Sequence, residues 1–323
     1  MIVIAGKSNA TLSTKIAENL NSTLFPVNIA NFKNGEIKIE IQKTIRNEHV
    51  FIVQTGYCNL YMNYSVNDIL IETLLMIDAI RRSNPKSISL VIPLFFYSRQ
   101  DRKDLSREPI SASFICRMFE TSGVDRILTI DLHSPQTQGF FYKAFDNLYC
   151  VNVLHSKLNE YFNNDLTRMV LISPDVGAVA RTSKISKIMN IPFTVIYKHR
   201  DSAGKVIKNE ILSSNHEYGN KKAIIVDDMI DSGGTFLKAC ELLIQNGFAE
   251  VYGCITHGLF TSDAIKNIND STYIKKIFVS NSVDQTSNIA KSTKIVEFDV
   301  SYLLSSAITK IHEGLPLGTL FEY

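Results

Sequence analysis

Short apolar runs alternate with longer segments of helical period along the whole chain, and this alternation limits the fold more than any other feature. The short runs are rich in β-branched residues and end at polar or turn residues, which is typical of buried strands. In the longer segments apolar residues recur with the spacing of one helix face. Strands and helices that alternate in this way favour an α/β fold with mainly parallel sheets. The expected strands are residues 2–4, 50–54, 88–93, 127–130, 169–173, 193–197 and 223–226.

The expected helices have recognisable ends. Asp68 is a candidate N-cap for a helix that ends before Pro85, and Gly123 is a candidate C-cap for a helix that begins at Ser111. Further helices are expected over residues 153–162, 176–189 and 235–245.

The alternation of strands and helices restarts near residues 147–153, although no linker rich in Pro, Gly or Ser marks the place. A chain of 323 residues is also long enough for two domains of ordinary size. We therefore expect two α/β domains, residues 1–148 and residues 149–323. The last ~15 residues are expected to pack back on the first domain.

Composition narrows the class of protein. The 34 Lys and Arg residues nearly balance the 32 Asp and Glu residues, and a net charge of +2 does not suggest a broad basic face for nucleic acid. The five cysteines stand singly, so neither a zinc site nor a disulfide framework is indicated. No segment approaches the roughly 20 consecutive apolar residues of a membrane span. These features predict a soluble, cytoplasmic protein without a nucleic-acid or membrane partner.

The segment from Ala223 to Thr235 reads Ala-Ile-Ile-Val-Asp-Asp-Met-Ile-Asp-Ser-Gly-Gly-Thr and is the most informative part of the chain. It predicts a buried strand, then carboxylates, then a loop of small residues that opens a helix. Ligands collect at the carboxyl ends of parallel strands, and uncovered N–H groups at a helix N-terminus form a cradle for phosphate. An ordinary helix cap is the alternative. Three carboxylates within five residues nevertheless favour a binding site, because such crowding is electrostatically costly without a ligand or cation.

Several residues of this segment are therefore candidates for binding a phosphorylated polyol. Because successive strand residues face opposite sides, Asp227 and Asp228 are expected to point apart. The full set of candidates is Asp227, Asp228, Asp231, Ser232, Gly233, Gly234 and Thr235.

A second charged segment, residues 93–111, also follows an expected strand and combines aromatic, basic and acidic side chains. Its basic residues can neutralise a polyphosphate, and its aromatic residues can stack on a base. On their own these charges would equally suit a solvated loop. The basic candidates are Arg99, Arg102 and Lys103, and the aromatic candidates are Tyr97 and Phe96.

Residues 226–235 resemble the phosphoribosyl diphosphate signature of two families, the type I phosphoribosyltransferases and the ribose-phosphate pyrophosphokinases. The rest of the chain separates the two, because residues 93–111 resemble the ATP-binding segment of the pyrophosphokinases nearly residue for residue. The chain is thus identified as a member of the ribose-phosphate pyrophosphokinase family, with two type I phosphoribosyltransferase-like domains. Further matching segments are residues 31–36, 129–141, 172–177, 197–200 and 256–260.

The resemblance implies a ribose-phosphate diphosphokinase, which transfers the β,γ-pyrophosphoryl group of Mg-ATP to the C1 hydroxyl of ribose 5-phosphate and releases AMP. The first domain would bind ATP, and the second would bind ribose 5-phosphate. Lys198 and Arg200 would be the catalytic cations on a flexible loop, although Lys-His-Arg by itself is more typical of a solvated strand end. Fixed cations suit this reaction because charge moves onto the equatorial and leaving oxygens in the transition state.

The resemblance also implies Mg²⁺ as the cofactor. His133 and Asp175 would organise the ion, with Asp131 in support. A lone histidine is more often an ordinary core or surface residue, but His133 closely follows Asp131 at the end of an expected strand. Few protein ligands suffice for magnesium, because this ion keeps most of its water.

The residues of the ATP site follow from the same resemblance, and part of the site would be shared between subunits. Phe32, Asn34 and Glu36 would read adenine from a neighbouring subunit, which implies a homo-oligomer built from dimers, a hexamer in many members of the family. The complete ATP-binding set is Phe32, Asn34, Gly35, Glu36, Arg99, Gln100, Asp101, Lys103, Asp104 and His133.

Several positions depart from the family pattern. Tyr142 stands where an Asp is frequent, and Ala178 and Ala180 replace a Gly and a Lys. Pro316 and Gly318 lie where many members use serines to bind regulatory phosphate, and neither supplies a hydroxyl. Catalysis is therefore expected to persist, while phosphate activation or ADP allostery is altered.

Residues 57–67 look like an insertion of about six residues, a change that loops tolerate. Their apolar side chains suit either an interface or a loop that is partly exposed to solvent.

Two alternative functions stay open. A phosphoribosyltransferase would share the Asp-rich loop but usually lacks the ATP-binding segments, and a catalytically weak or regulatory homologue would keep most of the motifs.

Overall fold

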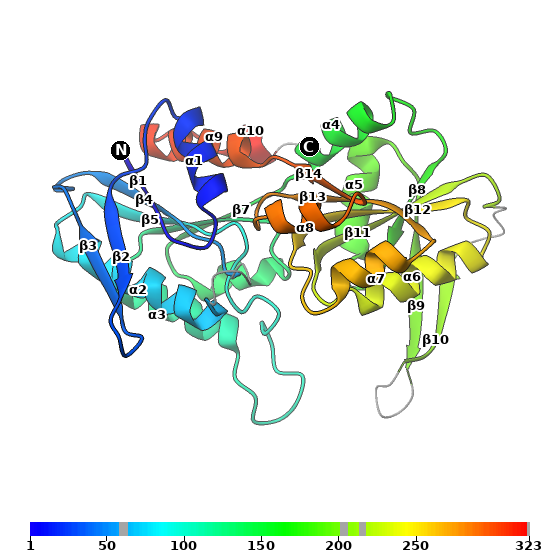
Figure 1. Cartoon of the computed structure of the whole chain (residues 1–323), viewed down its shortest axis with the longest axis horizontal. Coiled ribbons are helices and arrows are strands. Elements are labelled where there is room, and N and C mark those ends of the chain that lie inside the picture. Colours follow the sequence, from blue (N-terminus) through cyan, green and yellow to red (C-terminus); the bar gives the residue numbers. More distant parts are fainter. Residues whose placement is uncertain (58–63, 201–205, 213–217, 322–323) are drawn as a thin grey trace. The chain divides into compact units, whose positions relative to one another are not determined.

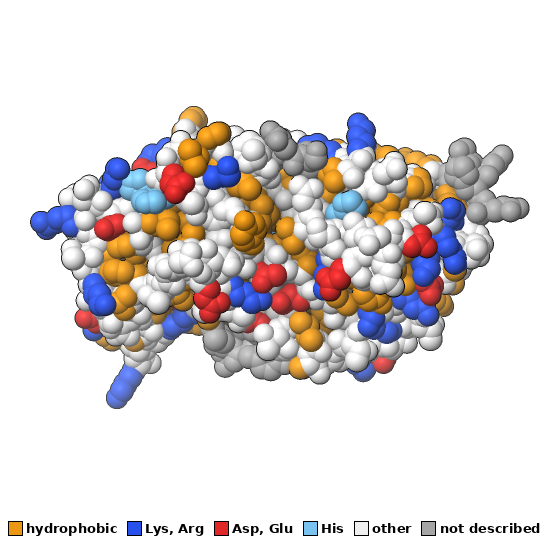
Figure 2. Space-filling model, turned by 90° about the horizontal axis from the view of Figure 1, so that it is seen from above, with side chains coloured by type: hydrophobic (Ala, Val, Ile, Leu, Met, Phe, Trp, Pro, Cys, Tyr) orange, Lys and Arg blue, Asp and Glu red, His pale blue; other side chains and the backbone are white. Residues whose placement is uncertain are grey.

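The computed structural model describes residues 1–57, 64–200, 206–212 and 218–321, which form two compact units (Figure 1). Unit 1 contains Met1–Cys150, Ser282–Asp284 and residues 300–321, and unit 2 contains Val151–Asn281 and Gln285–Asp299. In these described ranges, no helix combines the length and the apolar character needed to cross a membrane. On the face shown in Figure 2, acidic and basic side chains are interspersed.

Unit 1 is built on a five-stranded sheet whose neighbouring strands are all parallel. Its strand order is β1 (Ile2–Ala5), β4 (His49–Val53), β5 (Ser87–Val91), β6 (Arg126–Ile130) and β7 (Ala144–Leu148). Its helices are α1 (Ala10–Asn19), α2 (Val66–Arg82), α3 (Ser111–Ser122), the 3₁₀ helix η2 (Pro135–Phe140), α9 (Ser301–Glu313) and α10 (Gly318–Phe321). Helices α1 and α9 pack together on one face of the sheet, and α2 and α3 lie on the other (Figure 1). Both faces are covered, which explains why the central strands are almost continuously apolar.

A separate antiparallel hairpin completes unit 1. It consists of β2 (Val27–Asn31) and β3 (Ile37–Ile41).

Local sequence signals account for the helix ends of unit 1. Gly123 adopts φ +103° as the C-cap of α3, as predicted, because glycine enters the left-handed region without a steric penalty. The prediction that Asp68 caps α2 was wrong. Ser65 is the N-cap, and Asp68 is the third residue of a capping box in which its carboxylate accepts from the amide of Ser65 at 2.9 Å. The side-chain and backbone hydrogen bonds from Ser65 lower the pKa of Asp68.

Unit 2 is built on a seven-stranded sheet in which only the β9–β10 pair is antiparallel. Its strand order is β10 (Val206–Leu212), β9 (Phe193–Arg200), β8 (Met169–Ser173), β11 (Lys222–Ile230), β12 (Glu250–Gly258), β13 (Ile274–Ser280) and β14 (Ile295–Phe298). Its helices are α4 (Val151–Tyr161), α5 (Val179–Met189), α6 (Gly234–Gln245), α7 (Ala264–Asp270) and α8 (Thr286–Lys291). The expected α/β class with mainly parallel sheets is confirmed.

Two elements of unit 2 differ from the prediction in ways that matter for the site. Strand β11 continues past Val226 to Ile230, because its last residues still pair with β12 as far as Gly258. Helix α5 begins at Val179, later than predicted, because the carboxylate of Asp175 accepts from the amide of Ala178 at 3.2 Å and holds a turn ahead of the helix.

Candidate active site

The end of β11 is open on one side. This strand pairs with β8 only as far as Ile225 and with β12 as far as Ile230. Asp227 and Asp228 lie in the stretch beyond Ile225, inside the strand rather than after it as predicted. Their carboxylates have a charged partner in the helix that follows β8.

Arg181 from α5 is that partner, and it was not identified from the sequence. Its Nη1 lies 3.0 Å from Oδ1 of Asp228 and 3.8 Å from Oδ1 of Asp227. The Asp228 side chain is 5% exposed and that of Arg181 is 19% exposed, so the pair is largely withdrawn from solvent. One guanidinium thus reaches both carboxylates, although neighbouring strand residues normally point apart. A single Arg in a helix carries no periodic signal that could have revealed this contact.

The two carboxylates differ in their electrostatics. Burial, with the neighbouring carboxylate of Asp228, raises the pKa of Asp227 to about 8, and Arg181 opposes both effects. The amide of Asp228 donates to Oδ1 of Asp227 at 2.9 Å, and Arg181 directly balances the charge of Asp228. The environment of the cluster therefore favours the protonated form of Asp227.

The phosphate loop, residues 231–235, connects β11 to α6. Gly233 is the N-cap of α6 with φ +79°, a conformation that residues with a Cβ rarely adopt. Gly233 has no side chain to cap the helix, so the first amides of α6 stay available to an anion, and Ser232, Gly234 and Thr235 are exposed. The local geometry is that of the phosphate cradle predicted from the sequence.

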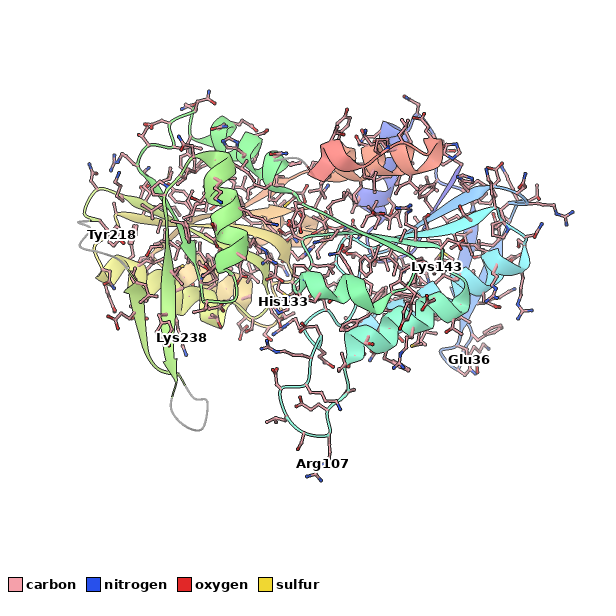
Figure 3. All side chains as sticks on the ribbon, turned by 180° about the vertical axis from the view of Figure 1, so that it is seen from behind. Glu36, Arg107, His133, Lys143, Tyr218 and Lys238 are labelled. Carbon is pink, nitrogen blue, oxygen red and sulfur yellow. The ribbon has the colours of Figure 1, made fainter. Side chains whose placement is uncertain are left out.

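The charged segment of unit 1 forms a long loop between β5 and α3, with Arg107 near its tip (Figure 3). Gln100 joins the two ends of this loop, because its amide donates to Tyr97 O at 3.0 Å and its carbonyl accepts from Ala112 N at 3.1 Å. Its side-chain oxygen also accepts from the hydroxyl of Ser111. The base of the loop is therefore fixed by hydrogen bonds.

The outer part of the same loop is organised by Glu108. Its Oε2 accepts from the amides of Asp104 and Leu105 at 3.1 and 2.9 Å. Arg102 pairs with Asp104 at 3.0 Å, and both side chains are exposed. Glu108 was not identified from the sequence as part of the site.

The two aromatic candidates of the loop have different surroundings. Phe96 is fully buried against Phe119, so the suggestion that it stacks on a base was wrong. Tyr97 is partly buried, and its hydroxyl donates to Asn67.

At the end of β6, Asp131 and His133 have different environments. Asp131 is buried with φ +45°, and its Oδ2 lies 3.3 Å from Cys150 N and 2.9 Å from Cys150 Sγ. His133 is exposed (Figure 3). The carboxylate of Asp131 thus supports the turn, while the imidazole of His133 is accessible to a ligand.

The adenine-reading candidates gather at the tip of the β2–β3 hairpin. Phe32 N donates to Glu36 O at 2.8 Å, and Glu36 N donates to Oδ1 of Asn34 at 3.3 Å. Gly35 has φ +93°, which closes the turn. The ring of Phe32 is 54% exposed, and Glu36 lies at the edge of unit 1 (Figure 3).

The structure describes the backbone of the two catalytic candidates but not their side chains. Lys198 and Arg200 lie in β9, where their backbones pair with Asn209 and Val206 of β10. Their side chains lie outside the described part of the structure, as does most of the proposed insertion at residues 57–67.

The positions that depart from the family pattern lie in contrasting places. Tyr142 is 90% exposed on the surface of unit 1. Ala178 is buried, and Ala180 is exposed in the first turn of α5.

The fold and the site define a class of protein before any comparison is made. Unit 2 carries a phosphate cradle beside paired carboxylates at the carboxyl ends of parallel strands, and unit 1 carries an anchored, charged loop. Such a chain is an α/β protein that handles phosphorylated small molecules.

Comparisons with known proteins then give the family. Residues 1–123 match the model of the N-terminal domain of ribose phosphate pyrophosphokinase, and residues 207–322 match the phosphoribosyl synthetase-associated domain. Ribose-phosphate pyrophosphokinase A of Dictyostelium discoideum is 36% identical over 320 residues, which are 99% of this chain and 97% of the relative. The ribose-phosphate pyrophosphokinase of Rhizobium meliloti (strain 1021) is 36% identical over 322 residues and covers 100% of both chains.

A solved structure agrees with these sequence matches. The crystal structure of phosphoribosylpyrophosphate synthetase from Mycobacterium smegmatis superposes with a TM-score of 0.87 at 29% identity, over 97% of this chain and 99% of that chain. The chain belongs to the ribose-phosphate pyrophosphokinase family.

Proposed function

We propose that this chain is a ribose-phosphate diphosphokinase, which transfers the β,γ-pyrophosphoryl group of ATP to the C1 hydroxyl of ribose 5-phosphate. The products are phosphoribosyl diphosphate and AMP. The observation that carries the proposal is the phosphate loop of residues 231–235, with its uncapped helix N-terminus beside Asp227 and Asp228, in a chain of this family. A phosphoribosyltransferase is not favoured, because the relatives that match over the whole length are pyrophosphokinases.

Unit 2 binds the sugar phosphate in this proposal. The amides at the start of α6 and the hydroxyls of Ser232 and Thr235 hold the 5-phosphate, since an uncapped helix N-terminus favours an anion. Asp228, paired with Arg181, accepts a hydrogen bond from a ribose hydroxyl. Asp227, whose pKa is raised to about 8, offers a proton as well as an acceptor oxygen.

Unit 1 binds ATP in this proposal. The loop fixed at Gln100 presents its basic side chains to the triphosphate, and the exposed Phe32 of the hairpin tip is free to stack on adenine. An exposed tip supports the further proposal that adenine is read by a neighbouring subunit in a dimer-based homo-oligomer, up to a hexamer. The other ATP-binding residues that we propose are Asn34, Gly35, Glu36, Arg99, Asp101, Lys103, Asp104 and His133.

Catalysis rests on position and charge. The C1 hydroxyl of the sugar attacks the β-phosphorus of ATP, the bond from that phosphorus to the α,β-bridging oxygen breaks, and AMP leaves with that oxygen. Lys198 and Arg200 stabilise the charge that develops on the transferred group, as fixed cations do more strongly in the transition state than in the ground state. Alignment of the two substrates contributes the rest of the rate.

The side chains present fit Mg²⁺ as the cofactor, held largely by the substrate phosphates. Within the described residues, no group of three His, Cys, Asp or Glu side chains is placed to hold a metal by itself. Exposed His133 and partly exposed Asp175 are suited to a hydrated ion, while Asp131 acts through the turn that it supports. Bound magnesium would neutralise phosphate charge and orient the leaving group.

Two regulatory and cellular features belong to the same proposal. Pro316 and Gly318 offer no hydroxyl to a regulatory phosphate, so activation by phosphate or inhibition by ADP is altered. A cytoplasmic location is supported by the buried thiols of Cys116, Cys240 and Cys254, which suit a reducing compartment.

The test is a phosphorus NMR experiment with the purified protein, Mg-ATP and ribose 5-phosphate. We expect AMP and a sugar diphosphate to appear together in equal amounts. Formation of ADP with a sugar bisphosphate would show a different kinase. No turnover above background would favour the catalytically weak, regulatory alternative.

A further inference from the structure

A second loop of unit 2 lies against the phosphate loop. Residues 259–263 lead from β12 to α7, and α7 lies beside α6 (Figure 1). The amide of Leu259 donates to Ile230 O at 2.8 Å, and the amide of Thr261 donates to Asp231 O at 3.1 Å. The hydroxyl of Thr261 also donates to Oδ1 of Asp231 at 2.5 Å. Thr261 therefore holds both the backbone and the carboxylate of the first residue of the phosphate loop.

The backbone around Thr261 is held in an uncommon conformation. Phe260 and Ser262, on either side of it, adopt φ +46° and +54°, which non-glycine residues rarely do. Such conformations persist only where the surroundings impose them. Phe260 is buried with its ring over Gly258, where a Cβ atom would lie 2.4 Å from the ring. The packing of Phe260 thus fixes the position from which the hydroxyl of Thr261 reaches Asp231.

Asp231 needs such a restraint because of its charge. A carboxylate within a loop that binds a phosphate ester repels the ligand if it turns toward it. A short hydrogen bond from a hydroxyl to a carboxylate is strong and directional, and it fixes the carboxylate in one rotamer. Asp231 is only partly buried, so burial alone does not fix its side chain.

We infer that Thr261 is a positioning residue for the sugar-phosphate site, because its hydroxyl keeps the Asp231 carboxylate turned away from the 5-phosphate. The inference rests on the proposed function, which names ribose 5-phosphate as the ligand of this loop. Thr261 itself does not contact the ligand. It sets the affinity of unit 2 for the phosphate ester and leaves the ATP-binding residues of unit 1 unaffected.

The test compares Thr261→Val, which keeps the shape of the side chain and removes the hydroxyl, with Thr261→Ser, which keeps the hydroxyl. Steady-state kinetics give kcat and KM for both substrates, and calorimetry gives the Kd of ribose 5-phosphate. Thr261→Val should raise KM and Kd for ribose 5-phosphate about five- to tenfold and leave KM for ATP unchanged. Thr261→Ser should stay within about twofold of the wild type.

Thr167→Val is a matched control in the same unit. The hydroxyl of Thr167 donates to Oδ1 of Asp165 at 2.6 Å and its amide donates to the same oxygen at 3.2 Å. This pair precedes β8, at the amino end of the parallel strands, whereas the phosphate loop follows the carboxyl end of β11. Thr167→Val should therefore leave both KM values unchanged.

A double-mutant cycle separates positioning from packing. In an Asp231→Ala background, Thr261→Val should have no further effect on kcat/KM for ribose 5-phosphate, because the carboxylate that it restrains is absent. The inference would be overturned if Thr261→Val had its full effect in the Asp231→Ala background. It would also be overturned if Thr261→Val alone raised both KM values equally or bound ribose 5-phosphate like the wild type. A wild type that neither binds nor converts ribose 5-phosphate would instead refute the proposed function, and the inference with it.

Discussion

The unusual protonation of Asp227 gives the structure a measurable signature in stability. Burial and, after it, the neighbouring Asp228 raise the pKa of this carboxyl from 3.8 to about 8. In an unfolded chain the group has its ordinary pKa, so between about pH 4 and pH 8 the folded state binds more protons than the unfolded state. The stability linked to this proton is fully present below about pH 4 and is lost as the pH rises through about 8. The free energy of unfolding should therefore fall across this window.

Asp227→Asn tests this reasoning, because the amide is neutral at every pH and its oxygen can still accept from Asp228 N, as the carboxylate does at 2.9 Å. A difference of one bound proton changes the free energy of unfolding by about 1.4 kcal/mol per pH unit, which gives about 4 kcal/mol between about pH 5 and pH 8. The Asp227 side chain is 31% exposed, so solvent screening reduces the expected effect to about 1–2 kcal/mol. The free energy of unfolding of the variant, relative to that of the wild type, should thus be about 1–2 kcal/mol higher at about pH 8 than at about pH 5.

The assay is urea unfolding of both proteins at a series of pH values, with turnover measured alongside. Asp165→Asn is the control, because hydrogen bonds from Thr167 lower the pKa of Asp165 and place its titration below the window. Parallel stability profiles for Asp227→Asn and the wild type would refute the account of this cluster.

Three further outcomes are expected. Lys198→Ala should lower kcat by about 10²-fold or more and leave the unfolding transition unchanged, whereas the control Lys238→Ala, on the exposed face of α6, should keep the wild-type kcat. A near-normal kcat for Lys198→Ala would contradict the catalytic role of Lys198. Glu108→Ala should raise KM for ATP about three- to tenfold by releasing the amides of the loop, with Glu108→Gln less affected; equal KM values in a kinetic assay would contradict this. Chelation of Mg²⁺ should abolish turnover and leave the thermal unfolding of the free protein unchanged, and activity that survives chelation would refute the cofactor assignment.

The strands of the two sheets could be predicted well from the sequence where burial on both faces makes them continuously apolar. Strand β8 spans Met169–Ser173, as predicted. The prediction for β11 stopped too early, because Asp227 and Asp228 interrupt the apolar run. Pairing with β12 extends this strand to Ile230, and such pairing is a tertiary contact that the local pattern does not carry.

The site could be predicted in part. The phosphate loop was recognisable because small residues and carboxylates follow an apolar run, and Gly233 has φ +79°, which glycine adopts without a steric penalty. Arg181 and Thr261 were missed, because they reach Asp228 and Asp231, respectively, from elements distant in sequence. The partner of Asp131, Cys150, was missed for the same reason.

The central claim is that the sugar hydroxyl attacks the β-phosphorus of ATP, and an isotope experiment tests it most directly. ATP labelled with ¹⁸O at the α,β-bridging position is incubated with Mg²⁺, ribose 5-phosphate and the protein, and the products are examined by phosphorus NMR and mass spectrometry. Because the bond between the bridging oxygen and the β-phosphorus breaks, the account predicts that the label appears in AMP. A label found in the sugar diphosphate, or release of ADP in place of AMP, would contradict it.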